Sequence, residues 1–455
     1  MLICRLLRFV LFTVAFCCAP ALSLLAQTYT DLHDFSPSAG NLLYPAQLAQ
    51  GLDGNFYGTL PFAGAAGFGQ VFQATPSGQI TVLFTFDSAN GSYPESGLTL
   101  GTDGNFYGSS SDGGKFGSGT VFKITHSGTL TTLHNFTGDV AKDGASPYCF
   151  PVQGVDGNFY GTTDSGTAYK ISSSGRFRLL NSSLPGHTIG PLILARNGNF
   201  YGVTLNGGEW NQGALFEMTR AGAVSVLYSF VQGVTGANPY GPLVEGPDGS
   251  LYGTTTTGAQ FLGGTIFKLS PGHGGAVTVV YYFAQNATGF NAIAGPVLGT
   301  DGNLYGATIA GGTDFVGVLF RSSTSGAYEV LYDMDTTHGA NPASTQIQGT
   351  NGKFYGLANP GGLYNGGVFY SLDAGLRPFV SLVNGLGKVG TNVVILGQGL
   401  TGTTKVSFHG KSASFKIISD TSLTAQVPEG ATNGVVEVTT PSGKLKSNRP
   451  FRVLQ

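Results

Sequence analysis

Short apolar segments alternate with polar, glycine-rich turns along nearly the whole chain, and no stretch has the 3.6-residue periodicity of an amphipathic helix. Within residues 97–136 this pattern predicts four strands, at 97–101, 105–110, 119–125 and 129–136. The dipeptide Asp103-Gly104 lies between the first two and predicts a type I′ turn, because these residues reach positive φ readily. The chain is therefore expected to be all-β.

The same unit occurs seven times, each copy marked by the motif Asp/Asn-Gly-x-Phe/Leu-Tyr-Gly. A second aromatic position follows the motif tyrosine by 14 or 15 residues in six copies and by 9 in the third, which has lost six residues from one loop. The motif tyrosines are Tyr57, Tyr107, Tyr160, Tyr201, Tyr252, Tyr305 and Tyr355.

Neighbouring Phe and Tyr residues in the second strand point to opposite faces of their sheet, so both faces carry a large ring that needs cover. Face-to-face sheets around an axis supply that cover and limit exposed edges, which predicts a seven-bladed β-propeller of four-stranded blades. Residues 29–35 resemble a fourth strand, and the last copy (344–372) lacks one. We expect the N-terminal strand to complete the last blade.

The repeat stops near residue 376, and a second domain is expected to follow it. Six short apolar stretches there predict a small immunoglobulin-like β-sandwich, at 393–396, 406–408, 415–418, 423–427, 435–439 and 451–454. The predicted organisation is a signal peptide at 1–26, a propeller at 27–375 and the sandwich at 376–455.

Residues 1–26 have the features of a secretory signal peptide: Arg5 and Arg8, an apolar run, and small residues ending at Ala26. This predicts a secreted or extracellular protein, or one held in the periplasm or at the cell surface. No later run reaches the roughly 20 apolar residues of a membrane span. Cys149 is the one cysteine after the leader, and we expect it to be buried packing rather than a nucleophile.

Charge excludes one class of partner. Charged residues make up 10% of the chain and the net charge is −2, so no basic field exists to attract a phosphate backbone, and nucleic acid is not an expected partner.

Two families resemble parts of the sequence. The repeats resemble the bacterial Gloeo_Verruco (GloVer) tandem repeat through segments such as 119–123 (Gly-Thr-Val-Phe-Lys) and 301–306 (Asp-Gly-Asn-Leu-Tyr-Gly). The tail resembles an IPT/TIG domain through 387–391, 395–400 and 427–431. Neither resemblance implies a defined reaction; IPT/TIG modules act as spacers or binding modules in surface receptors and some polysaccharide enzymes.

Seven equivalent Asp or Asn residues in the motif turns could offer oxygen ligands to calcium, but each is followed by the glycine that its turn needs. We therefore interpret them as turn residues and predict no metal site and no cofactor. The segment 385–390 spells GxGxxG, but a strand rather than a helix is expected after it, which argues against dinucleotide binding. The Asp/Asn positions are Asp53, Asp103, Asp156, Asn197, Asp248, Asp301 and Asn351.

A second series consists of aromatic residues in the loops between strands two and three, 9 to 11 residues after the motif tyrosine. Ring symmetry would bring them to one end of the propeller, where exposed rings suit stacking on sugars. In the alternative interpretation each ring fills a gap against the neighbouring blade. Trp210, the only tryptophan, is the best single candidate for a glycan contact. The predicted ligand-binding residues are Phe68, Phe116, Trp210, Phe261, Phe315 and Tyr364.

Strict repetition without a divergent catalytic copy favours a secreted, non-catalytic binding or interaction protein with an extracellular glycan or surface protein as partner. No catalytic residue is predicted. Two alternatives stay open: a polysaccharide hydrolase or lyase that uses the propeller funnel, because carboxylates paired across blades are invisible in the sequence, and a structural or adhesive surface protein.

Overall fold

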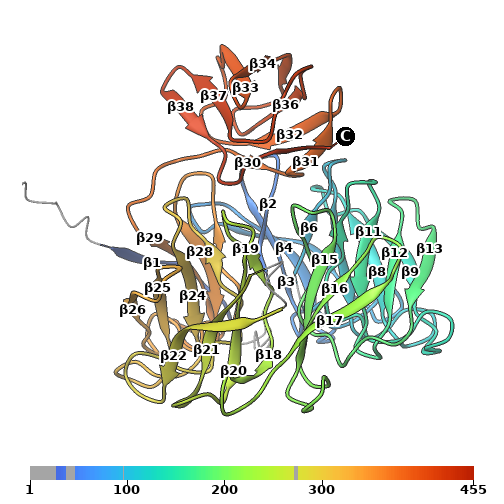
Figure 1. Ribbon diagram of the computed structural model, residues 1–455, viewed down its shortest axis with the longest axis vertical. Coiled ribbons are helices and arrows are strands. Elements are labelled where there is room, and N and C mark those ends of the chain that lie inside the picture. Colours follow the sequence, from blue (N-terminus) through green and yellow to red (C-terminus); the bar gives the residue numbers. More distant parts are fainter. Residues whose placement is uncertain (1–26, 37–46, 96, 271–274, 455) are drawn as a thin grey trace, which may run out of the picture.

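The computed structural model describes residues 27–36, 47–95, 97–270 and 275–454 (Figure 1). Within these residues, seven antiparallel sheets succeed one another between residues 28 and 373 and pack as the blades of a propeller, and a separate β domain follows. The predicted signal peptide at 1–26 lies outside the described residues. No helix in the described part of the chain has the length and hydropathy to cross a bilayer.

The strands of each sheet run outward from the axis in sequence order, except that the outermost strand of the last sheet comes from the start of the chain. The innermost strands are β2 (Ala49–Gln50), β6 (Thr99–Leu100), β10 (Val152–Gln153), β14 (Ile193–Leu194), β19 (Val244–Glu245), β23 (Val297–Leu298) and β27 (Ile347–Gln348). The second strands are β3 (Phe56–Leu60), β7 (Phe106–Ser110), β11 (Phe159–Thr162), β15 (Phe200–Thr204), β20 (Leu251–Thr257), β24 (Leu304–Thr308) and β28 (Phe354–Ala358).

The outer half of each sheet is equally regular. The third strands are β4 (Gln70–Ala74), β8 (Thr120–Ile124), β12 (Ala168–Ile171), β16 (Ala214–Met218), β21 (Leu262–Leu269), β25 (Val318–Ser322) and β29 (Val368–Asp373). The outermost strands are β5 (Ile80–Thr85), β9 (Leu130–Asn135), β13 (Phe177–Asn181), β17 (Val224–Ser229), β22 (Val277–Ala284), β26 (Tyr328–Asp333) and β1 (Thr28–Asp34).

Two sheets depart from the simple unit. β1 comes from the start of the chain and pairs antiparallel with β29, so the last sheet joins both ends of the repeat region. The fifth sheet has one strand more than the repeat predicted, because β18 (Ala237–Pro239) pairs with the extended end of β20.

The motif aromatics hold neighbouring sheets together. The tyrosine of one copy stacks on the phenylalanine of the next, and Tyr355 meets Phe56 at a centroid distance of 4.2 Å, which joins the last sheet to the first. In the fifth and sixth copies Leu251 and Leu304 take the phenylalanine position and share apolar clusters with Tyr201 and Tyr252. The other stacks are Tyr57–Phe106 (4.0 Å), Tyr107–Phe159 (3.7 Å), Tyr160–Phe200 (4.3 Å) and Tyr305–Phe354 (4.1 Å).

The glycine that ends the motif is explained by the aromatic ring opposite it. Gly253 pairs with Phe267 across β20 and β21, and a Cβ at Gly253 would lie 2.5 Å from the Phe267 ring. The same pairing recurs in every copy, with tyrosine as the partner in the third and seventh. The glycine thus makes room for the second aromatic position of the repeat, which in the seventh copy is Tyr370, 15 residues after Tyr355, and not Phe369 as predicted from the sequence.

The turn between the first and second strands differs from the predicted type I′ geometry. In the first copy Gly54 donates its N–H to the Gly51 carbonyl (3.1 Å), and Gly54 has a φ of 81° whereas Asp53 is not in the positive-φ region. This is a type I turn followed by a glycine bulge. The Asp53 carboxylate accepts hydrogen bonds from the Asn55 backbone (3.2 Å) and from the Tyr57 hydroxyl (2.8 Å), so it orients the tyrosine that stacks on the next sheet.

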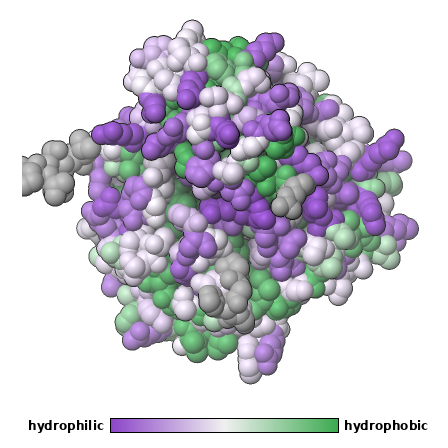
Figure 2. Space-filling model, turned by 45° about the horizontal axis from the view of Figure 1, so that its top comes forward, coloured by the Kyte–Doolittle hydropathy of each residue, from purple (hydrophilic) through white to green (hydrophobic). Residues whose placement is uncertain are grey.

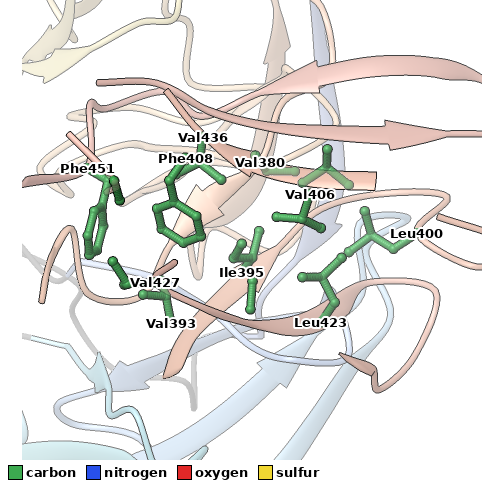
Figure 3. Close-up of a cluster of buried hydrophobic side chains, with 13 residues drawn as sticks. Val380, Val393, Ile395, Leu400, Val406, Phe408, Leu423, Val427, Val436 and Phe451 are labelled. Atoms are coloured by element: carbon green, nitrogen blue, oxygen red, sulfur yellow. The ribbon is translucent and has the colours of Figure 1, made fainter. Parts of the chain in front are cut away.

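The C-terminal domain is a sandwich whose two faces enclose one apolar core that includes Ile395, Phe408 and Phe451 (Figure 3). One sheet contains β30 (Ser381–Leu382), β32 (Asn392–Leu396), β36 (Ser422–Gln426) and β35 (Phe415–Ile417). The other contains β34 (Lys411–Ala413), β33 (Lys405–Phe408), β37 (Val436–Thr440) and β38 (Gly443–Lys446). A parallel pair, β31 (Leu386–Lys388) and β39 (Arg452–Leu454), completes the domain.

The sandwich sits on the end of the propeller that carries the motif turns (Figure 1). The Thr421 hydroxyl donates to the Leu52 carbonyl (2.6 Å), and the Gln398 amide donates to the Thr350 hydroxyl (2.9 Å). On the far side of the ring, the Arg452 guanidinium donates to the Arg196 carbonyl. The opposite end of the propeller stays uncovered by the sandwich.

We expect Gly253→Ala to lower the free energy of unfolding by about 1–3 kcal/mol, because the new methyl group overpacks against Phe267. Equilibrium unfolding in denaturant measures the change. In a Phe267→Leu background, Gly253→Ala is expected to lower the free energy of unfolding by less. Gly233→Ala is the matched control, since a Cβ there meets no atom within 4 Å. Equal losses for both glycine variants would contradict this explanation.

Candidate functional site

The uncovered end of the propeller, which we call the rim, collects most of the exposed large apolar side chains. It is built from the loops that join strands two and three and from the longer connections between sheets. Nine of the thirteen exposed large apolar residues found in the described part of the chain lie here, and exposed apolar patches are typical of surfaces that contact other molecules. They are Phe116, Val140, Trp210, Val234, Phe261, Leu262, Phe315, Leu363 and Tyr364. Figure 2 shows hydrophobic patches on the lower part of the propeller, away from the sandwich.

Local backbone geometry explains why most of the predicted aromatics point outward. Four of them stand 9 residues after the motif tyrosine and directly before a residue with positive φ, which places them at the tip of a tight turn. They are Phe116, Trp210, Phe261 and Tyr364, and about half of each side chain is exposed.

The remaining two predicted residues occupy shifted positions. Phe315 follows its motif tyrosine by 10 residues, itself has a φ of 58°, and is 65% exposed. Phe68 follows its motif tyrosine by 11 residues. Its side chain turns back toward the protein and is half-buried against Tyr93 and the apolar cluster between the first two sheets. Five of the six predicted rings are thus exposed together at one end, and Phe68 contributes to packing instead.

Hydrogen bonds to side chains fix the loop that presents Trp210. The Asn211 side chain accepts a hydrogen bond from the Gly207 N–H (2.9 Å), and the Ser229 hydroxyl accepts one from the Glu209 N–H (3.0 Å). The indole is 57% exposed and stacks on no other aromatic ring of the described residues. A rigid loop with a free ring is suited to stacking on a ligand.

The shortened third copy leaves a hollow beside this loop. A cavity of about 330 Å³ lies between the loop at 163–167 and the connection at 184–187, and the Asp164 carboxylate faces the His187 imidazole there at 3.1 Å. The Trp210 loop borders it, because the Asn206 amide oxygen accepts from the His187 N–H (3.1 Å) and the Pro185 carbonyl accepts from the Gly208 N–H (3.1 Å). The missing six residues signalled this gap in the sequence, but the Asp164–His187 pair joins two copies and had no local signal.

A buried carboxyl group lies near the axis at the same end. Glu95 precedes the inner strand β6, is 6% exposed, and has one carboxylate oxygen without a hydrogen-bond partner. Burial, reinforced by the nearby Asp112 carboxylate, raises the pKa of Glu95 to about 8. Sequence reasoning missed Glu95, because nothing in its neighbourhood indicated that the side chain would be buried.

The other sequence candidates have structural roles. Six of the seven Asp and Asn groups of the motif turns bind the hydroxyl of the motif tyrosine, as Asp301 does with Tyr305 (2.9 Å), whereas Asp248 binds Ser250 and Lys268. Among the described residues no three His, Cys, Asp or Glu side chains form a metal-binding group. The GxGxxG segment contains the strand β31, and Cys149 is buried in the propeller, where desolvation raises the pKa of its thiol.

The repeat and the tail both match known families. The model of the Gloeobacter/Verrucomicrobia repeat matches residues 21–175, 140–295 and 188–414, and the IPT/TIG domain model matches residues 378–452. The chain belongs to the Gloeobacter/Verrucomicrobia repeat family. Both predicted resemblances and the all-β fold class are thereby confirmed. None of the curated proteins matches this Gloeobacter/Verrucomicrobia repeat protein in sequence.

Solved propellers resemble this Gloeobacter/Verrucomicrobia repeat protein in fold alone. Virginiamycin B lyase from Staphylococcus aureus is 14% identical with a TM-score of 0.52, and the match covers 76% of this chain and 98% of the lyase. The WD40 β-propeller domain of Doa1 is 11% identical with a TM-score of 0.52, and the match covers 75% of this chain and 96% of that domain. At sequence identities this low, the activities of these proteins cannot be assigned to this chain.

Proposed function

We propose that this protein is an exported, non-catalytic binding protein whose propeller rim binds carbohydrate, while the IPT/TIG domain occupies the other end. The observation that carries the proposal is the gathering of exposed rings at Phe116, Trp210, Phe261, Phe315 and Tyr364 on one end. A soluble surface leaves rings exposed in such number where another molecule covers them.

The Trp210 loop and the cavity next to it provide the most complete single subsite. Sugars present an apolar face of C–H groups and a rim of hydroxyls, so they bind where a ring lies beside hydrogen-bonding groups. Trp210 supplies the ring, and Asp164 and His187 supply an acceptor and a second polar group within the 330 Å³ hollow. The rim rings of the other copies would contact further units of a polymeric glycan.

We expect Trp210→Ala to weaken retention on a glycan array about tenfold, which corresponds to about 1.4 kcal/mol and is typical of one lost ring contact. Val226→Ala is the matched control: Val226 is an equally exposed apolar residue on β17 of the same sheet but lies away from the rim. Asp164→Asn is expected to reduce retention as well. Unchanged glycan retention by Trp210→Ala, or an equal loss of retention with Val226→Ala, would contradict the proposal that the rim binds glycan.

Glu95 supports a second candidate function, a polysaccharide hydrolase or lyase. A carboxyl group with a pKa near 8 is protonated at neutral pH and can act as a general acid, with Asp112 as the second carboxylate. This alternative predicts that the protein releases sugars from a polysaccharide panel, that release declines as the pH rises through about 8, and that Glu95→Gln abolishes it. Retention on the panel without any released sugar would contradict the enzyme and favour the binding protein.

A further inference from the structure

An axial chamber lies at the other end of the propeller, where the sandwich covers the ring of inner strands. Two adjoining cavities of about 250 and 350 Å³ make up this chamber, and they share wall residues that include Leu243 of the propeller and Leu382 of the sandwich. The wall is polar and apolar in about equal parts, because the inner strands present Leu, Val and Ile side chains to the axis together with Gln and Thr side chains. The chamber is separate from the rim and its rings.

Arg449 brings a positive charge into this chamber. It lies in the connection from β38 to β39 of the sandwich, borders both cavities, and its side chain is exposed to solvent there. Its guanidinium makes no ion pair or hydrogen bond with any described residue. The protein atoms that surround this exposed side chain partly desolvate its charge and so lower the pKa of Arg449.

The one carboxylate in the chamber wall is already engaged elsewhere. Glu245 accepts a hydrogen bond from the Arg196 backbone (3.0 Å) and lies 3.9 Å from the Arg196 guanidinium. Arg449 is therefore left with electrostatic attraction to Glu245 but no direct contact. An arginine fork without a partner inside a cavity is arranged to pair with an anionic group of a ligand.

A side cleft adjoins the chamber, and its charged lining residues are also positive. This cleft of about 630 Å³ shares Gln153, Asn384 and Leu386 with the chamber wall. Its charged lining residues are Arg220 and Lys388. Chamber and cleft together carry four cations and one carboxylate, whereas the whole chain has 22 Lys and Arg against 24 Asp and Glu. Such segregation of charge attracts anions along the cleft.

We propose that the chamber binds a small amphiphilic anion, with its charged head on the Arg449 guanidinium and its apolar body against the walls formed by residues such as Leu243 and Leu382. A neutral apolar ligand would leave the Arg449 guanidinium without an anionic partner, and a bare inorganic anion would leave the apolar part of the walls in contact with water. The size of the cavities fits a small molecule. This site is independent of the glycan-binding rim.

The test uses n-octanoate, 1-octanol and n-octylammonium, which share one apolar chain and differ in the charge of the head. Isothermal titration calorimetry of the purified protein is expected to show binding of octanoate at least tenfold tighter than that of octanol, with no binding of octylammonium. Arg449→Met is expected to weaken octanoate binding at least tenfold. Arg178→Met, at an exposed arginine on β13, is the matched control and is expected to leave binding unchanged.

A second variant keeps the test decisive if Arg449→Met disturbs the contact between domains. Glu245→Gln removes the competing carboxylate but retains Arg449, so octanoate is expected to bind several-fold more tightly. Equal affinity for octanoate and octanol, equal affinity for octanoate and inorganic sulfate, or an unaltered octanoate affinity in both variants would overturn the proposal. None of these variants touches the rim, so failure here leaves the glycan test unaffected.

Discussion

The structure depends on the contact between the motif tyrosine of one sheet and the phenylalanine or leucine of the next. This contact recurs around the ring and joins the last sheet to the first through Tyr355 and Phe56. Each tyrosine is buried by it, and six of the seven are also oriented by a turn carboxylate or amide, so the Asp-Gly or Asn-Gly turn, the aromatic pair and the final glycine of the motif serve one purpose. A sheet by itself would expose both of its apolar faces to water.

The motif residues hold the ring of sheets together, so the loops at the two ends of the propeller can differ in sequence and surface chemistry. One end presents aromatic tips on short glycine-rich turns, and its shortened third loop leaves a hollow beside Trp210. The other end is covered by the IPT/TIG domain, whose Arg449 borders the axial chamber. We propose that the first end binds sugar surfaces and that the second binds a small anion with an apolar body, so that one scaffold would carry two chemically distinct sites.

Much of the fold could be predicted because its determinants are local and repeated. In the second copy the four strands were predicted to within one or two residues, and the unpaired segment at 29–35 indicated the pairing that β1 makes with β29. The turn type was wrong because a glycine after an aspartate fits both a type I′ turn and a type I turn with a bulge. The strand β18 had no counterpart in the repeat.

The candidate sites were harder to predict because they depend on non-local placement. The series of rim aromatics followed from spacing alone, yet a shift of two residues was enough to turn Phe68 inward. The pair of Asp164 with His187 joins two copies, and the burial of Glu95 depends on the surrounding loops. The position of Arg449 depends on how one domain sits on the other, which no repeat pattern encodes.

The contact between sheets is tested most directly by a double-mutant cycle on Tyr107 and Phe159, whose rings stack at 3.7 Å. Phe159→Leu introduces the residue that two other copies already use, and Tyr107→Leu removes the partner ring. Equilibrium unfolding of the two single variants and the double variant gives their coupling free energy, and the loss of the Tyr107–Asp103 hydrogen bond cancels in the cycle. The account predicts a favourable coupling of about 1 kcal/mol. Additive effects, with a coupling near zero, would contradict it.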